Sequence, residues 1–244
     1  MIALGEGATA EERQAEAAIR GVALWQGAEL RYRRAAPAIA SPMYRAVEGH
    51  CWVVEADRRD RFFLKLTAAE VVSLIDTAAT IEAAIMAAGL GIAPTLLAAV
   101  PVQGALVFAL LDEGWRTAQQ RDLMDPAVVA RIIAAQATFH AAPPLGRTRS
   151  VFQQVEDHFR RAMDAGIGLP PDQGWLMESV RLIAAAIAAA PVATVPCHGD
   201  PIASNIMLGP DGQVMLVDWD QAANADPCWD LGILLAEGVP FDRA

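Results

Sequence analysis

The first part of the chain carries its apolar residues in short runs, several of which alternate with polar positions as strands with one buried face do. Two longer stretches, residues 8–27 and 68–89, instead place apolar residues at helical spacing. Gly89, Gly91 and Pro94 end the second of these helices. The pattern predicts a sheet accompanied by two helices. The strand-like runs cover residues 29–34, 43–47, 50–55, 61–66, 95–100 and 105–111.

Beyond residue 112 the pattern changes to helical spacing. Residues 125–140, 151–165 and 175–190 each repeat apolar residues as one face of a helix does. Strands first and helices second are typical of an α+β protein. We therefore expect two lobes, an N-terminal one over residues 1–111 and a C-terminal one over residues 112–244.

Composition narrows the class of protein. The chain has 19 basic and 29 acidic residues and a net charge of −10, which disfavours a nucleic-acid-binding protein. The longest largely apolar stretch, residues 182–195, contains Pro191 and is shorter than the roughly 20 residues of a membrane-spanning helix. The N-terminus has no basic region followed by an apolar run, as a secretory signal would have. The three cysteines have no metal-like spacing, so reduced thiols in the cytoplasm are expected.

The only lysine of the chain is Lys65; the other eighteen basic residues are arginines. Lys65 lies in the apolar strand-like run 61–66, where alternation places it on one face with Phe63. A lysine within such a strand is not where solvated charge usually lies. Chance survival on a surface strand is the plain alternative, but the position makes Lys65 a candidate phosphate ligand.

The segment His198-Gly-Asp-Pro-Ile-Ala-Ser-Asn205 combines a carboxylate with an amide five residues later. Phosphoryl transfer needs a carboxylate that orients the attacking hydroxyl and accepts its proton, and oxygen ligands for Mg²⁺. Asp200 would be the base and Asn205 a neutral metal ligand. The pair is common by itself and is a weak signal when alone.

A second acidic motif follows the apolar run Val214-Met-Leu-Val217 as Asp218-Trp-Asp220. Pro210-Asp-Gly212 forms a turn that would bring this strand back beside Asn205. Mg²⁺ prefers oxygen ligands, so Asp218 is a candidate ligand and Asp220 a supporting carboxylate. A solvated turn that carries Asp residues is the alternative.

A third acidic motif, Asn224-Ala-Asp-Pro-Cys-Trp-Asp230-Leu-Gly232, begins a helix near Asp226-Pro227. Asp230 is flanked by Trp229 and Leu231, which favours a buried position. We expect Asp230 to support the loop at residues 198–205 through its backbone rather than to contact a substrate.

With these motifs in place, the chain resembles the bacterial choline kinase branch of the aminoglycoside phosphotransferase and choline kinase superfamily. The resemblance spans about residues 21 to 236, and its motifs are much more specific in their order and spacing than singly. The matching stretches are Ala23-Leu-Trp25, Phe63-Leu-Lys65, Gly91-Ile-Ala-Pro94, Phe139-His140, residues 151–170, Pro196-Cys-His-Gly-Asp200 with Asn205, and Val217-Asp-Trp219 with Asn224, Asp226 and Trp229-Asp-Leu231.

The resemblance implies a protein-kinase-like fold that binds ATP in the cleft between a nucleotide-binding N-terminal lobe and a catalytic C-terminal lobe. Lys65 would contact the phosphates. The hinge that cradles adenine would fall at residues 107–111, with Val107 and Leu110 as nucleotide-binding residues.

For the C-terminal lobe, the resemblance implies that Asp200 is the catalytic base and that Asn205 and Asp218 bind Mg²⁺. His198 would shape the loop through hydrogen bonds, since Asp200 already has the proton-transfer role. His140 is expected to be a structural histidine on a helix.

The chain departs from the family pattern in three places. Residues 38–44, where the family has a glycine-rich phosphate loop, contain no glycine and include Pro42. Thr80 stands where a helix glutamate would pair with the lysine, and the nearest acid, Glu82, is turned by about 200° on the helix. The sequence ends at Ala244, before the further helices that wall the acceptor pocket in relatives.

These features favour an ATP- and Mg²⁺-dependent kinase that phosphorylates a hydroxyl on a small molecule, with choline or ethanolamine as first candidates. Aminoglycosides, thiamine and sugars are alternative acceptors. A kinase-fold protein that binds nucleotide or a partner without turnover is the alternative from another class. We expect a small-molecule acceptor, no nucleic acid and no membrane as partners, and we leave a homodimer open.

Overall fold

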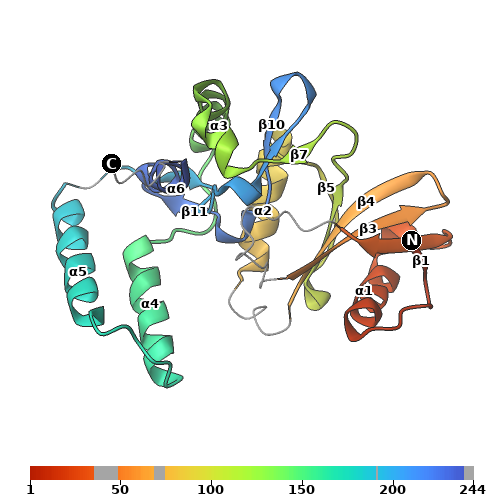
Figure 1. Cartoon of the computed structure of the whole chain (residues 1–244), viewed down its shortest axis with the longest axis horizontal. Coiled ribbons are helices and arrows are strands. Elements are labelled where there is room, and N and C mark those ends of the chain that lie inside the picture. The colour runs from red at the N-terminus through yellow and green to blue at the C-terminus, as the bar shows by residue number, and fades with distance from the viewer. Residues whose placement is uncertain (36–48, 69–74, 191, 239–244) are drawn as a thin grey trace.

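The computed structural model describes residues 1–35, 49–68, 75–190 and 192–238. Its N-terminal part is a six-stranded antiparallel sheet (Figure 1) with the strand order β1-β2-β3-β4-β6-β5. The strands are β1 (Ile2–Ala3), β2 (Leu30–Arg34), β3 (Gly49–Ala56), β4 (Asp60–Thr67), β5 (Leu96–Val100) and β6 (Ala105–Ala109). The predicted sheet is confirmed, apart from the run at 43–47, which lies outside the described residues.

A tight turn joins β3 to β4. Asp57 and Arg58 both have positive φ, 50° and 56°, as the central residues of the turns that match strand twist in hairpins do. The turn fixes the register of the pair, in which Cys51 lies opposite Lys65 and Val53 opposite Phe63. Alternation then fixes which side chains of β4 share a face of the sheet.

Helix α1 (Ala10–Gly21) covers one face of the sheet. It begins with a capping box in which Thr9 and Glu12 each accept from the backbone of the other. A short 3₁₀ turn, η1 (Ala23–Trp25), follows. The core on this face combines buried residues of α1, η1 and the strands: Ala15, Ala18, Ile19, Trp25, Tyr32, Val54, Leu64, Leu66 and Val107.

Glu16 is a buried carboxylate at the centre of the contacts between α1, β2 and the N-terminal segment. It accepts hydrogen bonds from the Gly5 and Gly7 backbone N–H groups, both at 2.8 Å, and from the Tyr32 hydroxyl at 2.9 Å. Replacing Glu16 with alanine is expected to lower the free energy of unfolding by about 3 kcal/mol, because these three donors and Arg20 Nη2, at 3.2 Å, lose a charged acceptor. Urea unfolding measures this loss, and Glu6→Ala, at an exposed position nearby, is the matched control.

The same contacts make the effect of Glu16 pH-dependent. Burial raises the pKa of the Glu16 carboxyl, but the hydrogen bonds from Tyr32, Gly5 and Gly7 outweigh it, so the pKa lies below its ordinary value. The stabilisation is therefore present above the unfolded pKa and is lost as the pH falls through the folded one. The difference in the free energy of unfolding between wild type and Glu16→Ala should become smaller as the pH falls from neutral to about 2.5. A constant difference would contradict this account.

The C-terminal part is mainly helical. Its helices are α3 (Pro126–His140), α4 (Val151–Asp164), α5 (Gln173–Ala189) and α6 (Cys228–Gly238), while α2 (Thr77–Gly89) precedes β5 in the chain. Two small antiparallel sheets have the orders β10-β9-β7 and β11-β8, formed by β7 (Arg116–Thr117), β8 (Val195–Cys197), β9 (Ile206–Leu208), β10 (Val214–Leu216) and β11 (Ala223–Ala225). The second core joins α2 and α3 to these strands around Ile132, Phe139, Leu216 and Trp219.

Helices α4 and α5 lie side by side and stand apart from the rest of the described fold (Figure 1). No residue of α4 is buried, and Met177 is the only buried residue of α5. Trp175 and Leu182 are 69% and 63% exposed. The predicted helical second half and the α+β class are therefore confirmed, although this pair of helices contributes little to the core.

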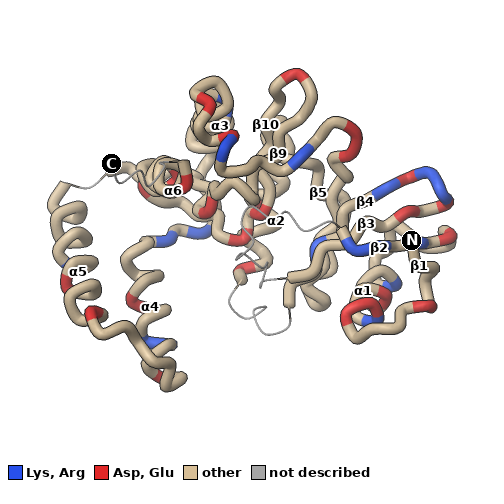
Figure 2. Tube along the Cα trace, in the orientation of Figure 1, with Lys and Arg blue, Asp and Glu red and all other residues tan. Residues whose placement is uncertain are grey.

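Across residues 1–35, 49–68, 75–190 and 192–238, no helix combines the length and the hydrophobicity needed to cross a membrane. Basic and acidic positions are interspersed along the described trace (Figure 2). All three cysteines are described, and all have free thiols. The division into lobes at residue 112 stays a prediction.

Candidate active site

The site is built around Lys65, which lies on a central strand of the sheet between β3 and β6. Its neighbours Leu64 and Leu66 point into the core beneath α1, so Lys65 points from the opposite face. There its Nζ donates to Asp218 Oδ1 at 2.6 Å and to Asp220 Oδ2 at 2.7 Å. The candidate phosphate ligand and a candidate metal ligand are therefore in direct contact.

The hairpin of β9 and β10 positions Asp218. Asp211 and Gly212 at its tip both have positive φ, 61° and 77°, which close a tight turn. Beyond the paired strands, the Val217 N–H donates to the Asn205 carbonyl at 2.9 Å. This hydrogen bond brings the residue before Asp218 beside Asn205, as the sequence predicted from the turn.

Asn205 in turn contacts Asp200. Its side-chain Nδ2 donates to the Asp200 carbonyl oxygen at 2.9 Å and to Asp200 Oδ2 at 3.0 Å. Because the amide nitrogen is used by Asp200, the amide oxygen is the atom of Asn205 that can bind a cation. An amide oxygen from Asn205 and a carboxylate from Asp218, on segments joined by the Val217–Asn205 backbone hydrogen bond, are the donor chemistry that Mg²⁺ prefers, so the residues present fit this ion.

Asp230 holds the backbone at the start of the 198–205 loop. It is fully buried and accepts from the His198 N–H at 2.9 Å and the Gly199 N–H at 2.8 Å. His140 Nε2 lies 3.0 Å from the same carboxylate. Burial raises the pKa of the Asp230 carboxyl, but these hydrogen bonds outweigh it, and the pKa lies below its ordinary value. Asp230 is therefore an ionised anchor for the loop.

His198 and Gly199 shape the loop in different ways. His198 Nε2 donates to the Val217 carbonyl at 3.0 Å, while its Nδ1 accepts from the Asp200 N–H at 3.2 Å. Burial lowers the pKa of the His198 imidazole, which agrees with a neutral ring. Gly199 has φ +83°, and a Cβ there would lie 2.4 Å from the Gln221 carbonyl oxygen. A glycine is required at this close approach.

Lys65, Asp218 and Asp220 shift the pKa values of one another. Burial lowers the pKa of the Lys65 ammonium, but Asp218 and Asp220 outweigh it, and the pKa lies above its ordinary value. Burial also raises the pKa of both carboxyls; Lys65 reverses this at Asp218, whose pKa is lowered, but not at Asp220, whose pKa is raised. We conclude that Lys65 is charged at neutral pH and that Asp218 is ionised beside it.

The predicted nucleotide-binding residues Val107 and Leu110 lie on and just after strand β6. Val107 pairs with Leu64 across β4 and β6 and belongs to the core beneath α1, so its side chain points away from the face that presents Lys65. Leu106, opposite Lys65, and Phe108, opposite Phe63, are on that face instead. The strand register decides which side chains share the face of Lys65, and the nucleotide-binding role of Val107 and Leu110 stays a prediction. Leu110 follows the end of β6 and is half-buried.

Two further departures from the family pattern have structural outcomes. Glu82 does not reach Lys65: its two carboxylate oxygens accept from the Gly146 N–H at 3.1 and 3.0 Å, as its helical phase predicted. Thr80, at the position expected for the lysine partner, is buried, and its hydroxyl donates to the Asp76 carbonyl oxygen at 3.1 Å. It also lies near Asp220 and acts against the rise in the pKa of that carboxyl, a proximity that sequence reasoning missed. The glycine-free segment 38–44 lies outside the described residues.

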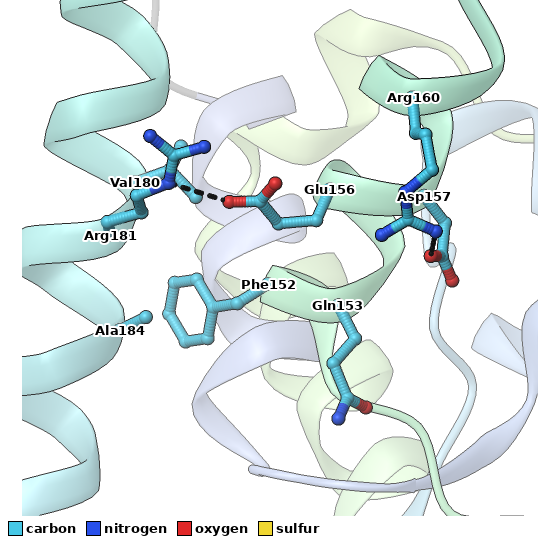
Figure 3. A pocket seen from close by; sticks show the side chains of 8 residues that line it. All are labelled: Phe152, Gln153, Glu156, Asp157, Arg160, Val180, Arg181 and Ala184. Atoms are coloured by element: carbon cyan, nitrogen blue, oxygen red, sulfur yellow. Dashed lines mark hydrogen bonds and ion pairs between the residues drawn. The ribbon is translucent and has the colours of Figure 1, made fainter. Parts of the chain in front are cut away.

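An open depression of about 400 Å³ lies between α4 and α5 (Figure 3). Arg181 Nε donates to Glu156 Oε1 across it at 3.0 Å, and Phe152 points toward Ala184. The lining residues are Phe152, Gln153, Glu156, Asp157, Arg160, Val180, Arg181 and Ala184. None of the predicted site residues is among them, so the candidate chemistry lies elsewhere, around Lys65 and Asp218.

The fold and the contacts of Lys65, Asp218 and Asn205 define a protein with the parts of a kinase-like phosphotransferase. Residues 48–244 match the family model described as "Phosphotransferase enzyme family". The chain belongs to this family of phosphotransferase enzymes.

Solved structures resemble the chain over nearly all of its length. A choline/ethanolamine kinase family protein from Mesorhizobium loti is 24% identical, with a TM-score of 0.70 over 93% of this chain and 70% of that chain. Choline kinase LicA from Streptococcus pneumoniae is 15% identical, with a TM-score of 0.75 over 95% and 77% of the two chains; LicA has also been solved in complex with AMP. A macrolide 2'-phosphotransferase type I is 16% identical, with a TM-score of 0.59 over 95% and 79%. These matches confirm the expected fold.

Proposed function

We propose that this protein transfers the γ-phosphoryl group of ATP to a hydroxyl of a small molecule in a Mg²⁺-dependent reaction. The observation that carries the proposal is the connected series of contacts from Lys65 to Asp218 and from Asn205 to Asp200, with Val217 and Asn205 joined by their backbones. These residue types in this order are what phosphoryl transfer needs. ATP is supported as the donor by the AMP complex of the similar LicA.

Each residue has a defined task in this proposal. Asp200 accepts the proton of the acceptor hydroxyl. The oxygen of that hydroxyl bonds to the γ-phosphorus while the bond from the γ-phosphorus to the ADP oxygen breaks. Lys65 neutralises phosphate charge. Asn205 and Asp218 would hold Mg²⁺, which neutralises the charge that develops on the phosphates when it is bound.

Choline or ethanolamine is the acceptor we put first. The similarity to the proteins named as choline kinase and choline/ethanolamine kinase family supports this choice, and the net charge of −10 suits a cationic acceptor. A macrolide or an aminoglycoside is the second choice, supported by the similar macrolide 2'-phosphotransferase and aminoglycoside phosphotransferase.

The proposal is tested by ADP release from Mg-ATP with choline, ethanolamine, thiamine, an aminoglycoside and a macrolide. We expect one acceptor class to raise ADP release at least tenfold above the rate without acceptor. Chelation of Mg²⁺ with excess EDTA should return the rate to background, because the phosphate charge is then left without its metal. If no acceptor raises ADP release while Mg-ATP still raises the melting temperature, a nucleotide-binding protein without turnover replaces the proposal.

A further inference from the structure

Within the part of the chain that the structure describes, Lys65 has two carboxylate partners, and neither comes from helix α2. In the kinase arrangement a helix glutamate pairs with the lysine that contacts the phosphates. Here Asp218 and Asp220 approach Lys65 from the turn after β10, at 2.6 and 2.7 Å. The described acid of α2, Glu82, binds the Gly146 N–H instead.

We propose that Asp220 replaces the helix carboxylate as the residue that positions Lys65. The inference rests on the proposed function, in which Lys65 contacts the phosphates of ATP. Asp218 is also the predicted Mg²⁺ ligand, so its carboxylate has a second task. Asp220 contacts Lys65 without that task, and its side chain is only 3% exposed.

Thr80 occupies the position on α2 where a carboxylate partner of Lys65 is expected. It is buried there, and its side chain lies near enough to Asp220 to act against the rise in the pKa of that carboxyl. A glutamate at this position would put a third carboxylate beside a single buried ammonium, with repulsion from the other two. A neutral hydroxyl instead adds no repulsion beside Asp220, the carboxylate that has taken over the pairing, and it donates its proton to the Asp76 carbonyl oxygen at 3.1 Å. Lys65 is thereby tied to the metal-binding segment rather than to α2.

The test compares Asp220→Asn, Glu82→Gln and the double variant Thr80→Glu with Asp220→Asn. We expect Asp220→Asn to raise the KM for ATP at least tenfold with a smaller change in kcat. Glu82→Gln should leave the KM unchanged, since its amide oxygen can still accept from Gly146. The double variant returns a carboxylate from the α2 side and should recover at least threefold of the lost affinity. Melting temperatures of all variants identify any that fail to fold.

The single lysine offers a readout that needs no turnover. Lys65 and the N-terminal amine are the only primary amines of the chain, so mass spectrometry after brief treatment with an acylating reagent measures Lys65 alone in its peptide. Asp220→Asn should accelerate acylation of Lys65 several-fold, Glu82→Gln should not, and the double variant should restore protection. Equal acylation rates in wild type and Asp220→Asn overturn the role of Asp220, whether or not the wild type turns over ATP. Faster acylation and a raised KM in Glu82→Gln alone would restore the helix arrangement and also overturn it.

Discussion

Asp200→Asn is expected to lower kcat for ADP release by about 10³-fold while the KM for ATP changes less than about threefold. The asparagine keeps an oxygen that can accept from Asn205 Nδ2, which donates to Asp200 Oδ2 at 3.0 Å. It cannot take a proton from the acceptor hydroxyl, so the loss appears in the chemical step. Steady-state ADP release with the acceptor found in the panel measures both constants.

The control for this substitution is Asp211→Asn. Asp211 is exposed at the tip of the β9–β10 hairpin with φ +61°, a conformation that asparagine also tolerates. The same chemical change there should leave kcat unaltered. If Asp200→Asn keeps the wild-type kcat, Asp200 is not the base, and the proton of the acceptor leaves by another route.

Strand β4 illustrates what the sequence could predict. Side chains in a strand point to alternate faces, so Lys65 and Leu64 had to lie on opposite faces once the strand formed. The structure bears this out, with Leu64 fully buried beneath α1. Helix α3 could be predicted equally well from the sequence, because Asp125-Pro126 supplies a side-chain cap and a proline in the first turn.

The ion pairs of Lys65 could not be predicted from the sequence in this way. Asp218 and Asp220 are 153 and 155 positions away from it, and the motifs indicate only that the segments share a site. Which carboxylate meets the ammonium depends on how α2 packs against the turn at residues 219–221. That packing is a tertiary property which local periodicity does not contain.

Other limits of the sequence follow the same division. The resemblance placed Val107 at the hinge but could not tell the face of its side chain, which depends on the strand register that pairs it with Leu64. Strands β7, β8 and β11 have only two or three residues each, too few for a period of two to be recognised. They form because neighbouring segments offer backbone partners.

Asp230→Asn is expected to lower the free energy of unfolding by about 3 kcal/mol, or the melting temperature by roughly 9 °C for a chain of this size. The carboxylate is fully buried and accepts from the backbone of His198 and of Gly199 through different oxygens. An asparagine presents one oxygen and one N–H₂ group, so one of the two backbone N–H groups meets a donor instead of an acceptor. Urea and thermal unfolding measure the loss.

This substitution should also affect the rate, because His198 and Gly199 precede Asp200 and set the direction of its carboxylate. We expect kcat to fall at least tenfold under conditions where the variant is fully folded. Glu178→Gln, at an exposed position on α5, is the control and should change neither stability nor rate. Since the pKa of Asp230 lies below its ordinary value, its stabilisation is present above the unfolded pKa and is lost as the pH falls through the folded one. Wild type and Asp230→Asn should therefore converge in stability at acid pH, and a difference that persists there would show that the asparagine acts by misfitting the core rather than by removing the charge.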